Sequence, residues 1–182
     1  PRVGLRMQLS EILNDLTYYG RGPEENYRDR RTSQFIGEYT TPIKDLYEPY
    51  IRPQENEHRT DIYWCALTTK QKAGLLFIAN RTFELNASNY LLGSLDSGET
   101  IDNGAPRTNE TNHRHLTDPQ PVKQVDMFID YRMMGVGGDN SWGAIAHEPY
   151  LIRPGVENAI EYGFSIVPFD KKADYKNLIY QY

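Results

Sequence analysis

Apolar and polar residues alternate along several short stretches of the chain, with the period of two that half-buried β-strands show. The alternation is clear in residues 3–9 (VGLRMQL) and weaker in residues 13–19 (LNDLTYY). Strand patterns return at residues 61–68 and 74–79, which a short turn containing Lys, Gln and Ala joins into a predicted β-hairpin. Residues 83–90 are expected to extend that meander.

Three later segments complete the predicted sheet. Residues 122–131 (VKQVDMFIDY) form one strand, and residues 149–152 and 158–167 supply the last two, separated by a turn at Pro154-Gly155. No long helical period and no internal repeat is found in the sequence. The pattern therefore predicts an all-β fold, an antiparallel β-sandwich or barrel with short helical insertions.

The stretches between the predicted strands carry turn and helix-start signals. Pro23 is expected to open a short helix within residues 20–31 (GRGPEENYRDRR), because two glutamates follow it in the first turn. Three prolines after residue 41 leave room only for a turn of helix near residues 44–47. Residues 94–121 are polar, with several Gly, Asn, Asp and Pro, and are expected to form a long surface excursion.

Length and charge narrow the class of protein. The 182 residues are enough for one large domain with its own core, which we place at residues 1–170, followed by a polar tail at residues 171–182 that is expected to be extended or tag-like. No apolar run approaches the roughly 20 residues that cross a bilayer, so no membrane partner is expected. The net charge of -5 argues against a nucleic-acid partner, because phosphate binding needs clustered Lys and Arg.

Two residue types add detail to this picture. The chain holds 14 tyrosines, and tyrosine favours both strands and sugar-binding surfaces. The single cysteine, Cys65, excludes an internal disulfide and a Cys-based zinc cage, and is expected to be a small buried hydrophobe. Because the chain starts at Pro1 without a methionine, we interpret it as an excised segment whose compartment the sequence leaves open.

Residues 133–143 (MMGVGGDNSWG) form the densest glycine segment, which could cradle a phosphate or present an aromatic side chain. A phosphate site requires a helix after the loop, and a P-loop requires a Lys-Ser/Thr pair as well. Both are missing, and Asp139 would repel an anion. The glycines are instead interpreted as bends that project the indole of Trp142, which is either a sugar-stacking surface or a lid folded back on the sheet edge.

Other candidate chemistry is weaker. His113 and His115 lie two residues apart and could share zinc with a third ligand such as His58, His147 or a carboxylate, but no such ligand stands at local spacing. The acidic residues are numerous, yet no pair can be chosen by spacing as the two carboxylates of a glycosidase. No nucleophile motif is present. By motif alone, the segment carries no catalytic residue and no metal site.

Five motifs occur in order along the chain: PRVGLRMQL, YGRGPEENYRDR, YEPYIRPQENEHRTDIYW, NHRHL and DYRMMGVGGDNSWG. Together they resemble the C-terminal, small-chain part of the bacterial β-galactosidases of glycoside hydrolase family 2, over nearly the whole chain. The resemblance implies the later part of a galactose-mutarotase-like β-supersandwich. In that family the supersandwich follows a jelly roll, immunoglobulin-like domains and a TIM barrel.

The resemblance also implies a division of labour. The two catalytic glutamates of the retaining mechanism and the metal ligands lie in the barrel, so Mg and Na ions are expected in other domains of the parent and none in this segment. The family motif GxGGDxSW is matched by residues 135–142, and Trp142 is implied to stack on the aglycone part of a β-galactoside. The loop residues beside it are Gly137, Gly138, Asp139, Asn140 and Ser141. Asn140 stands where some relatives have Asp, and no ligand role is implied for His113 or His115.

The expected function follows from these implications. The chain is expected to be a domain of a retaining β-galactosidase that hydrolyses terminal β-D-galactosides, with the isolated segment inactive. Its partners are the other domains of the parent and the substrate, and the parent is expected to be a bacterial homo-oligomer, cytoplasmic or periplasmic. Two alternatives stay open: a stand-alone carbohydrate-binding module, and a purely structural or oligomer-contact domain.

Overall fold

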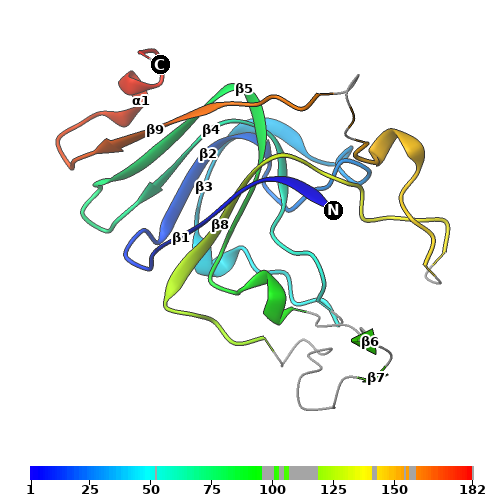
Figure 1. The fold of residues 1–182 in the computed structure, drawn as a ribbon. Coiled ribbons are helices and arrows are strands. Elements are labelled where there is room, and N and C mark those ends of the chain that lie inside the picture. The colour runs from blue at the N-terminus through cyan, green and yellow to red at the C-terminus, as the bar shows by residue number, and fades with distance from the viewer. Residues whose placement is uncertain are drawn as a thin grey trace.

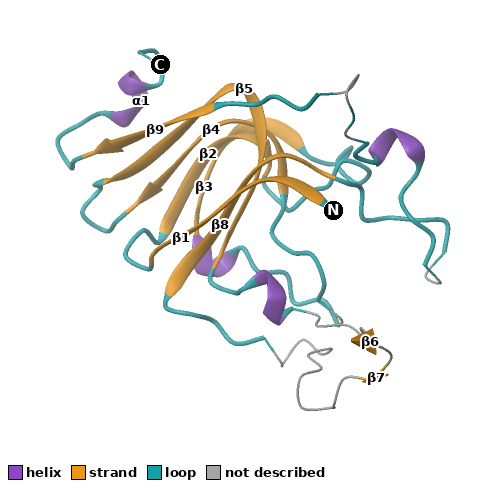
Figure 2. Cartoon of the chain, in the orientation of Figure 1, coloured by secondary structure: helices purple, strands orange, loops and turns teal. Residues whose placement is uncertain are grey.

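The computed structural model describes residues 1–51, 53–95, 101–102, 105–106, 119–140, 143–153, 155 and 159–181. Seven of the nine described strands form one antiparallel sheet that curves strongly, with helical structure limited to single turns (Figures 1 and 2). Along the sheet the order is β1 (Arg2–Ser10), β8 (Gln124–Met133), β5 (Gly74–Ser88), β4 (Arg59–Thr68), β2 (Asp15–Gly22) and β3 (Phe35–Pro42), and β9 (Phe164–Phe169) also pairs with β5. The predicted all-β, antiparallel class with short helical insertions is confirmed.

The short elements lie outside this sheet. They are the 3-10 turns η1 (Ile43–Asp45), η2 (Leu92–Ser94) and η4 (Glu148–Tyr150), the small strands β6 (Ile101–Asp102) and β7 (Ala105–Pro106), and the helical turn α1 (Tyr175–Leu178). In the described part of the chain, no helix has the length and apolar character needed to cross a membrane.

The main core covers one face of the sheet. Alternation along β4 sends Cys65 and Leu67 into it, while a register shift between Ile62 and Trp64 places Ile62 on the same face despite the odd spacing. Cys65 is fully buried, as predicted, and burial raises the pKa of its thiol. Each fully buried Ile or Leu side chain of this core stabilises the fold by about 1.5–3 kcal/mol relative to the same side chain exposed to water.

A second, smaller core lies on the opposite face of β4, β5 and β9. Trp64, Leu76 and Phe169 form its centre, and the C-terminal tail covers it through Tyr175 and Leu178. The tail therefore ends in a helical turn packed on the sheet, and the expectation of an extended or tag-like end is wrong for this part. The turn forms because the Asp174 side chain caps it, accepting the Lys176 N–H at 3.1 Å.

Three other predictions of local structure are wrong. Residues 74–79 and 83–88 belong to one long strand, β5, whose exposed polar middle resembled a turn, and residues 89–90 lie beyond its end. Residues 149–152 contribute to the turn η4 and not to a strand, because Pro149 removes a donor that a ladder needs. The segment after Pro23 is not helical: Tyr27 and Arg30 pair across a tight turn, and its polar side chains bond to neighbouring segments instead. The predicted turn of helix near residues 44–47 is present, shifted slightly, as η1.

Candidate functional site

The glycine segment follows the end of β8 and is held at its base from three sides. The Met133 N–H donates to Glu84 Oε2 at 2.6 Å, and the Gly135 N–H donates to the Tyr150 carbonyl at 2.9 Å. The Met134 N–H donates to the Pro1 carbonyl at 3.0 Å. These bonds satisfy the backbone donors where the strand leaves the sheet, so the loop departs from a fixed point.

A carboxylate from a distant part of the chain occupies the next two amides. Asp29 Oδ1 accepts the Val136 N–H at 3.2 Å, and Asp29 Oδ2 accepts the Gly137 N–H at 2.7 Å. A Cβ atom at Gly135 would lie 2.7 Å from the Asp29 carboxyl carbon and 2.9 Å from Tyr150 Cβ, closer than side chains pack. The glycine at 135 is thus required for close approach, which corrects its interpretation as a bend.

This arrangement bears on the phosphate alternative. The two adjacent amides that could face a phosphate are donated to Asp29, so the loop already holds an anion that belongs to the chain. No helix of useful length follows the loop in the described residues; η4 is a single 3-10 turn. The Val136 and Gly137 amides are therefore not free to bind a phosphate.

The outer part of the loop is exposed. Gly137, Gly138, Asp139 and Asn140 all face solvent. The Asp139 carboxylate pairs with the His147 ring at 2.7 Å across the loop, and both side chains are largely exposed. Ser141 and Trp142 lie outside the described residues, so their predicted roles stay predictions.

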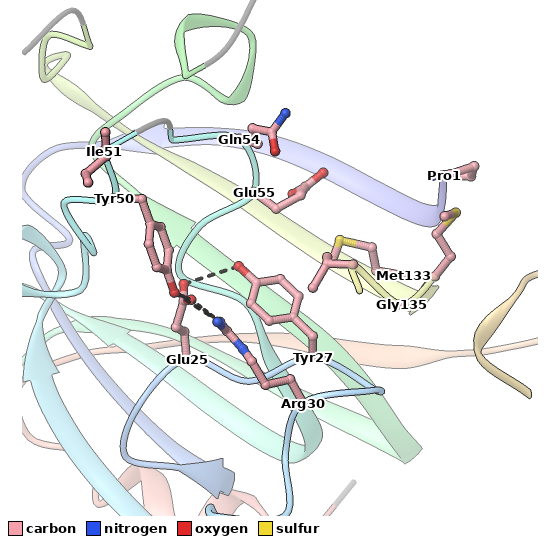
Figure 3. Close-up of a pocket in the computed structure, with 12 residues that line it drawn as sticks. Pro1, Glu25, Tyr27, Arg30, Tyr50, Ile51, Gln54, Glu55, Met133 and Gly135 are labelled. Carbon is pink, nitrogen blue, oxygen red and sulfur yellow. Dashed lines mark hydrogen bonds and ion pairs between the residues drawn. The ribbon is translucent and has the colours of Figure 1, made fainter. Parts of the chain in front are cut away.

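A pocket of about 650 Å³ opens beside the base of the loop, a volume typical of small-molecule sites. Sequence reasoning did not find it, because its walls come from four separate segments of the chain. Figure 3 shows the side chains that surround it: Tyr50 and Ile51 on one side, Pro1, Met133 and Gly135 on the opposite side, Glu25, Tyr27 and Arg30 below, and Gln54 and Glu55 above.

Glu25 organises the floor of this pocket. One carboxylate oxygen accepts from Arg30 at 2.5 Å and from the Tyr50 hydroxyl, and the other accepts from the Tyr27 hydroxyl at 3.2 Å and the Glu57 N–H at 2.8 Å (Figure 3). Burial raises the pKa of the Tyr27 hydroxyl, which stays protonated and donates. The Arg30 guanidinium also lies 4.9 Å from the centre of the Tyr27 ring. Four donors fill the acceptor positions of the Glu25 carboxylate, so its role is to hold the surrounding side chains in place.

Glu25→Ala is expected to lower the free energy of unfolding by about 2–3 kcal/mol, because the buried Tyr27 hydroxyl and the Glu57 N–H lose their acceptor. Chemical denaturation of the variant measures this. Glu24→Ala is the matched control, since Glu24 is the exposed acid next in the chain and should change stability by less than about 0.5 kcal/mol. Equal losses in the two variants would contradict the assignment.

A buried polar network lies behind the pocket. His58 is fully buried, with Nδ1 2.8 Å from Asn86 Oδ1 and Nε2 3.1 Å from Glu84 Oε2. Asn86 Nδ2 donates to the Asn56 carbonyl, so Oδ1 is the acceptor for the ring. Both ring nitrogens therefore lie within hydrogen-bond distance of a side-chain oxygen, which fixes the orientation of the ring.

Three further buried acids lie near this network, and two of them contact an arginine. Asp126 is bound bidentately by Arg6 at 2.7 and 2.9 Å. Asp130 lies 3.2 Å from Arg2, and burial raises the pKa of its carboxyl to about 6 against the lowering effect of that cation. Burial raises the pKa of Glu57 to about 8. Asp126 and Asp130 lie on β8 and Glu57 just before β4, and none of the three lines the pocket, so they do not form a pair of catalytic carboxylates there.

The metal hypothesis finds no additional ligand in the described residues. His58 is occupied by Asn86 and Glu84, and His147 by Asp139. No group of three or more His, Cys, Asp or Glu side chains in the described ranges is placed to hold an ion. His113 and His115 themselves lie outside the described residues.

The sequence is similar to one protein family and to several beta-galactosidases. Residues 1–166 match the family described as beta galactosidase small chain. A beta-galactosidase of Priestia megaterium is 33% identical over 152 residues, which is 84% of this chain and 13% of that protein. A beta-galactosidase of Vibrio cholerae is 32% identical over 152 residues, with the same two coverages, and one of Staphylococcus xylosus is 27% identical over 166 residues, 91% of this chain and 15% of that protein.

The chain thus spans only a small part of the length of these relatives. The family match covers β1 to β9 almost completely, including the Asp29 segment, the pocket and the glycine loop. Because it extends over far more than half of the residues, the chain belongs to the beta-galactosidase small chain family.

Proposed function

We propose that this chain is the C-terminal, small-chain domain of a larger retaining β-galactosidase of glycoside hydrolase family 2. In this proposal it buttresses the catalytic barrel and contributes Trp142 to the aglycone side of the site for a terminal β-D-galactoside. The relatives are named beta-galactosidases, and this chain matches 13% of the length of the first two. The catalytic glutamates and the Mg and Na ions of the parent are proposed to lie in its other domains.

One observation carries the proposal. Residues 136–140 are exposed to solvent, yet the first two of them are hydrogen-bonded to Asp29 and the residues just before them to Glu84 and Tyr150. An exposed loop on a rigid base is suited to presenting the residues that follow it to another surface. Trp142 follows two positions after Asn140.

The surrounding acids support a binding role over a catalytic one. Near the loop, Glu25 receives four donors and Asp29 receives two loop amides. Neither carboxylate is left to act as an acid or nucleophile across a sugar. Hydrolysis is therefore assigned to another part of the parent.

Trp142→Ala in the full-length parent is expected to raise the acceptor KM for glucose about tenfold, because the stacking contact is lost, and to leave formation of the galactosyl intermediate unchanged. The measurement is the ratio of galactosyl transfer to hydrolysis as glucose is added. Ile145→Ala is a control, since Ile145 is another exposed apolar residue close to the loop. An unchanged dependence on glucose in the Trp142 variant would reject the aglycone role.

A stand-alone carbohydrate-binding module would behave differently. It would bind galactosides as the isolated chain and change its tryptophan fluorescence on titration. We expect no saturable change up to tens of millimolar sugar, since one stacked ring supplies only a few kcal/mol. Saturable binding at lower concentration would favour the module over the domain of an enzyme.

A further inference from the structure

We infer that Asp29 is the positioning residue of the glycine loop: its carboxylate sets the path of residues 135–137 and thereby the place from which the loop extends. The consequence for substrate rests on the function proposed above, whereas the positioning itself does not. The two residues that Asp29 bonds stand 107 and 108 positions further along the chain. No pattern in either segment alone indicates the contact.

Asp29 is itself firmly placed. It sits at the tip of a tight turn in which the Tyr27 and Arg30 backbones exchange two hydrogen bonds of 3.0 and 2.8 Å. The buried Asn26 ties that turn to the main sheet, since its N–H donates to the His58 carbonyl at 2.7 Å and its Oδ1 accepts both the N–H and the hydroxyl of Thr60. A continuous set of hydrogen bonds therefore runs from the start of β4 to the loop.

The contact requires a carboxylate and not merely a polar side chain. Each of the two oxygens of Asp29 accepts one loop amide. An asparagine of the same shape offers one acceptor oxygen, and its NH₂ group would face the N–H of Val136 or Gly137. Within the described part of the chain, Asp29 makes no ion pair. Its carboxylate is bound there by the two loop amides.

The loop is shaped to receive this side chain. Gly135 leaves the space that the carboxylate fills, and a Cβ at Gly137 would lie 3.2 Å from Asp29 Oδ2, tighter than most packing contacts. Replacing Asp29 should therefore release the Val136 and Gly137 amides while the ladder of β8 stays intact. The effect is local, because the bonds of Met133 and Gly135 to Glu84 and Tyr150 do not involve Asp29.

Amide hydrogen exchange followed by NMR in this chain tests the inference. In Asp29→Asn and Asp29→Ala, the exchange rates of the Val136 and Gly137 amides are expected to rise at least about tenfold. The amide of Ile129, in the middle of β8, should exchange at its original rate, which separates local release from general destabilisation. Asp45→Asn, an exposed site on η1, is the isosteric control and should change none of these rates. Unchanged exchange at Val136 and Gly137 in both Asp29 variants would overturn the inference.

Kinetics in the full-length parent separate this inference from the proposed function. If Asp29 positions the loop and Trp142 contacts the aglycone, Asp29→Asn raises the acceptor KM for glucose several-fold without changing kcat for hydrolysis. If the amides are released and the acceptor KM stays the same, the positioning role stands and the aglycone role fails. If the amides are not released, the positioning role fails whatever the kinetics show.

Discussion

Gly4→Ala is expected to lower the free energy of unfolding by more than about 4 kcal/mol, a large share of the roughly 5–15 kcal/mol that stabilises a typical domain. Gly4 pairs with Asp130 between β1 and β8. A Cβ at this position would lie 2.5 Å from the Asp130 Cα and 2.7 Å from the Ile129 carbonyl oxygen. Both are backbone atoms, and they cannot move aside without breaking the ladders that join β8 to β1 and β5.

Gly93→Ala is the matched control for this variant. A Cβ at Gly93 would meet nothing within 4 Å, and the residue lies in the turn η2 away from the sheet. Its stability should stay within about 0.5 kcal/mol of the unmodified chain. Urea unfolding monitored by circular dichroism compares the two variants, and similar midpoints would show that the close approach of β1 to β8 is relaxed in solution.

Glu57→Gln is expected to stabilise the domain by roughly 5 kcal/mol at about pH 9 and to give little or no gain below about pH 4.5. Burial raises the pKa of Glu57 to about 8 from its ordinary 4.5; the Ser88 hydroxyl and Arg59 lower it in part, while Glu25 and Asp126 raise it further. The side chain is almost fully inside the protein. Ionising it in the folded state is therefore costly, and glutamine cannot ionise.

The sign follows from proton binding. Between about pH 4.5 and 8 the folded state holds a proton on Glu57 that the unfolded state has lost, so stability falls as the pH rises through this window. Above the folded pKa the loss is complete. Asp130, whose pKa is raised to about 6, adds a slope of the same sign in both proteins and cancels in their difference.

Denaturation at several pH values measures the difference between the glutamine variant and the unmodified chain. Glu11→Gln, at an exposed site after β1, is the control and should leave the pH dependence unchanged. The backbone strain at position 57, where φ is +62°, is the same in Glu and Gln and cancels in the comparison. Parallel pH curves for the Glu57 variant would show that this carboxyl is solvated.

The sequence predicts the strands whose apolar residues stand out from the turns around them. β1 was found from its alternation, and β2, β4 and β8 from apolar stretches that the core buries, on both faces in β4. β3 was missed because it is an edge strand with much of its apolar surface exposed: Phe35 is 72% and Ile36 40% accessible. Burial does not impose an alternation of apolar and polar residues on such a strand, so hydrophobic periodicity does not predict it.

The candidate site was predictable only in part. The glycine loop is visible in the sequence because its composition is unusual, but its partner Asp29 lies in a different motif more than a hundred residues away. The acids and tyrosines of the pocket are ordinary residues until the fold brings them together. Charged residues do crowd into GRGPEENYRDRR, but Pro23 and the two glutamates after it were interpreted as a helix start, because local rules do not include tertiary hydrogen bonds.

The pairing of β1 with β8 also has a consequence for how the domain is made. Ser10 pairs with Gln124, so β1 can join β8 only after the long stretch of chain between them has been synthesised. Contacts between such distant segments slow folding, because the loop between them must be closed before the pairing stabilises anything. Until then β1 lacks its partner β8, and the unpaired edges of both β1 and β5 are open to other molecules.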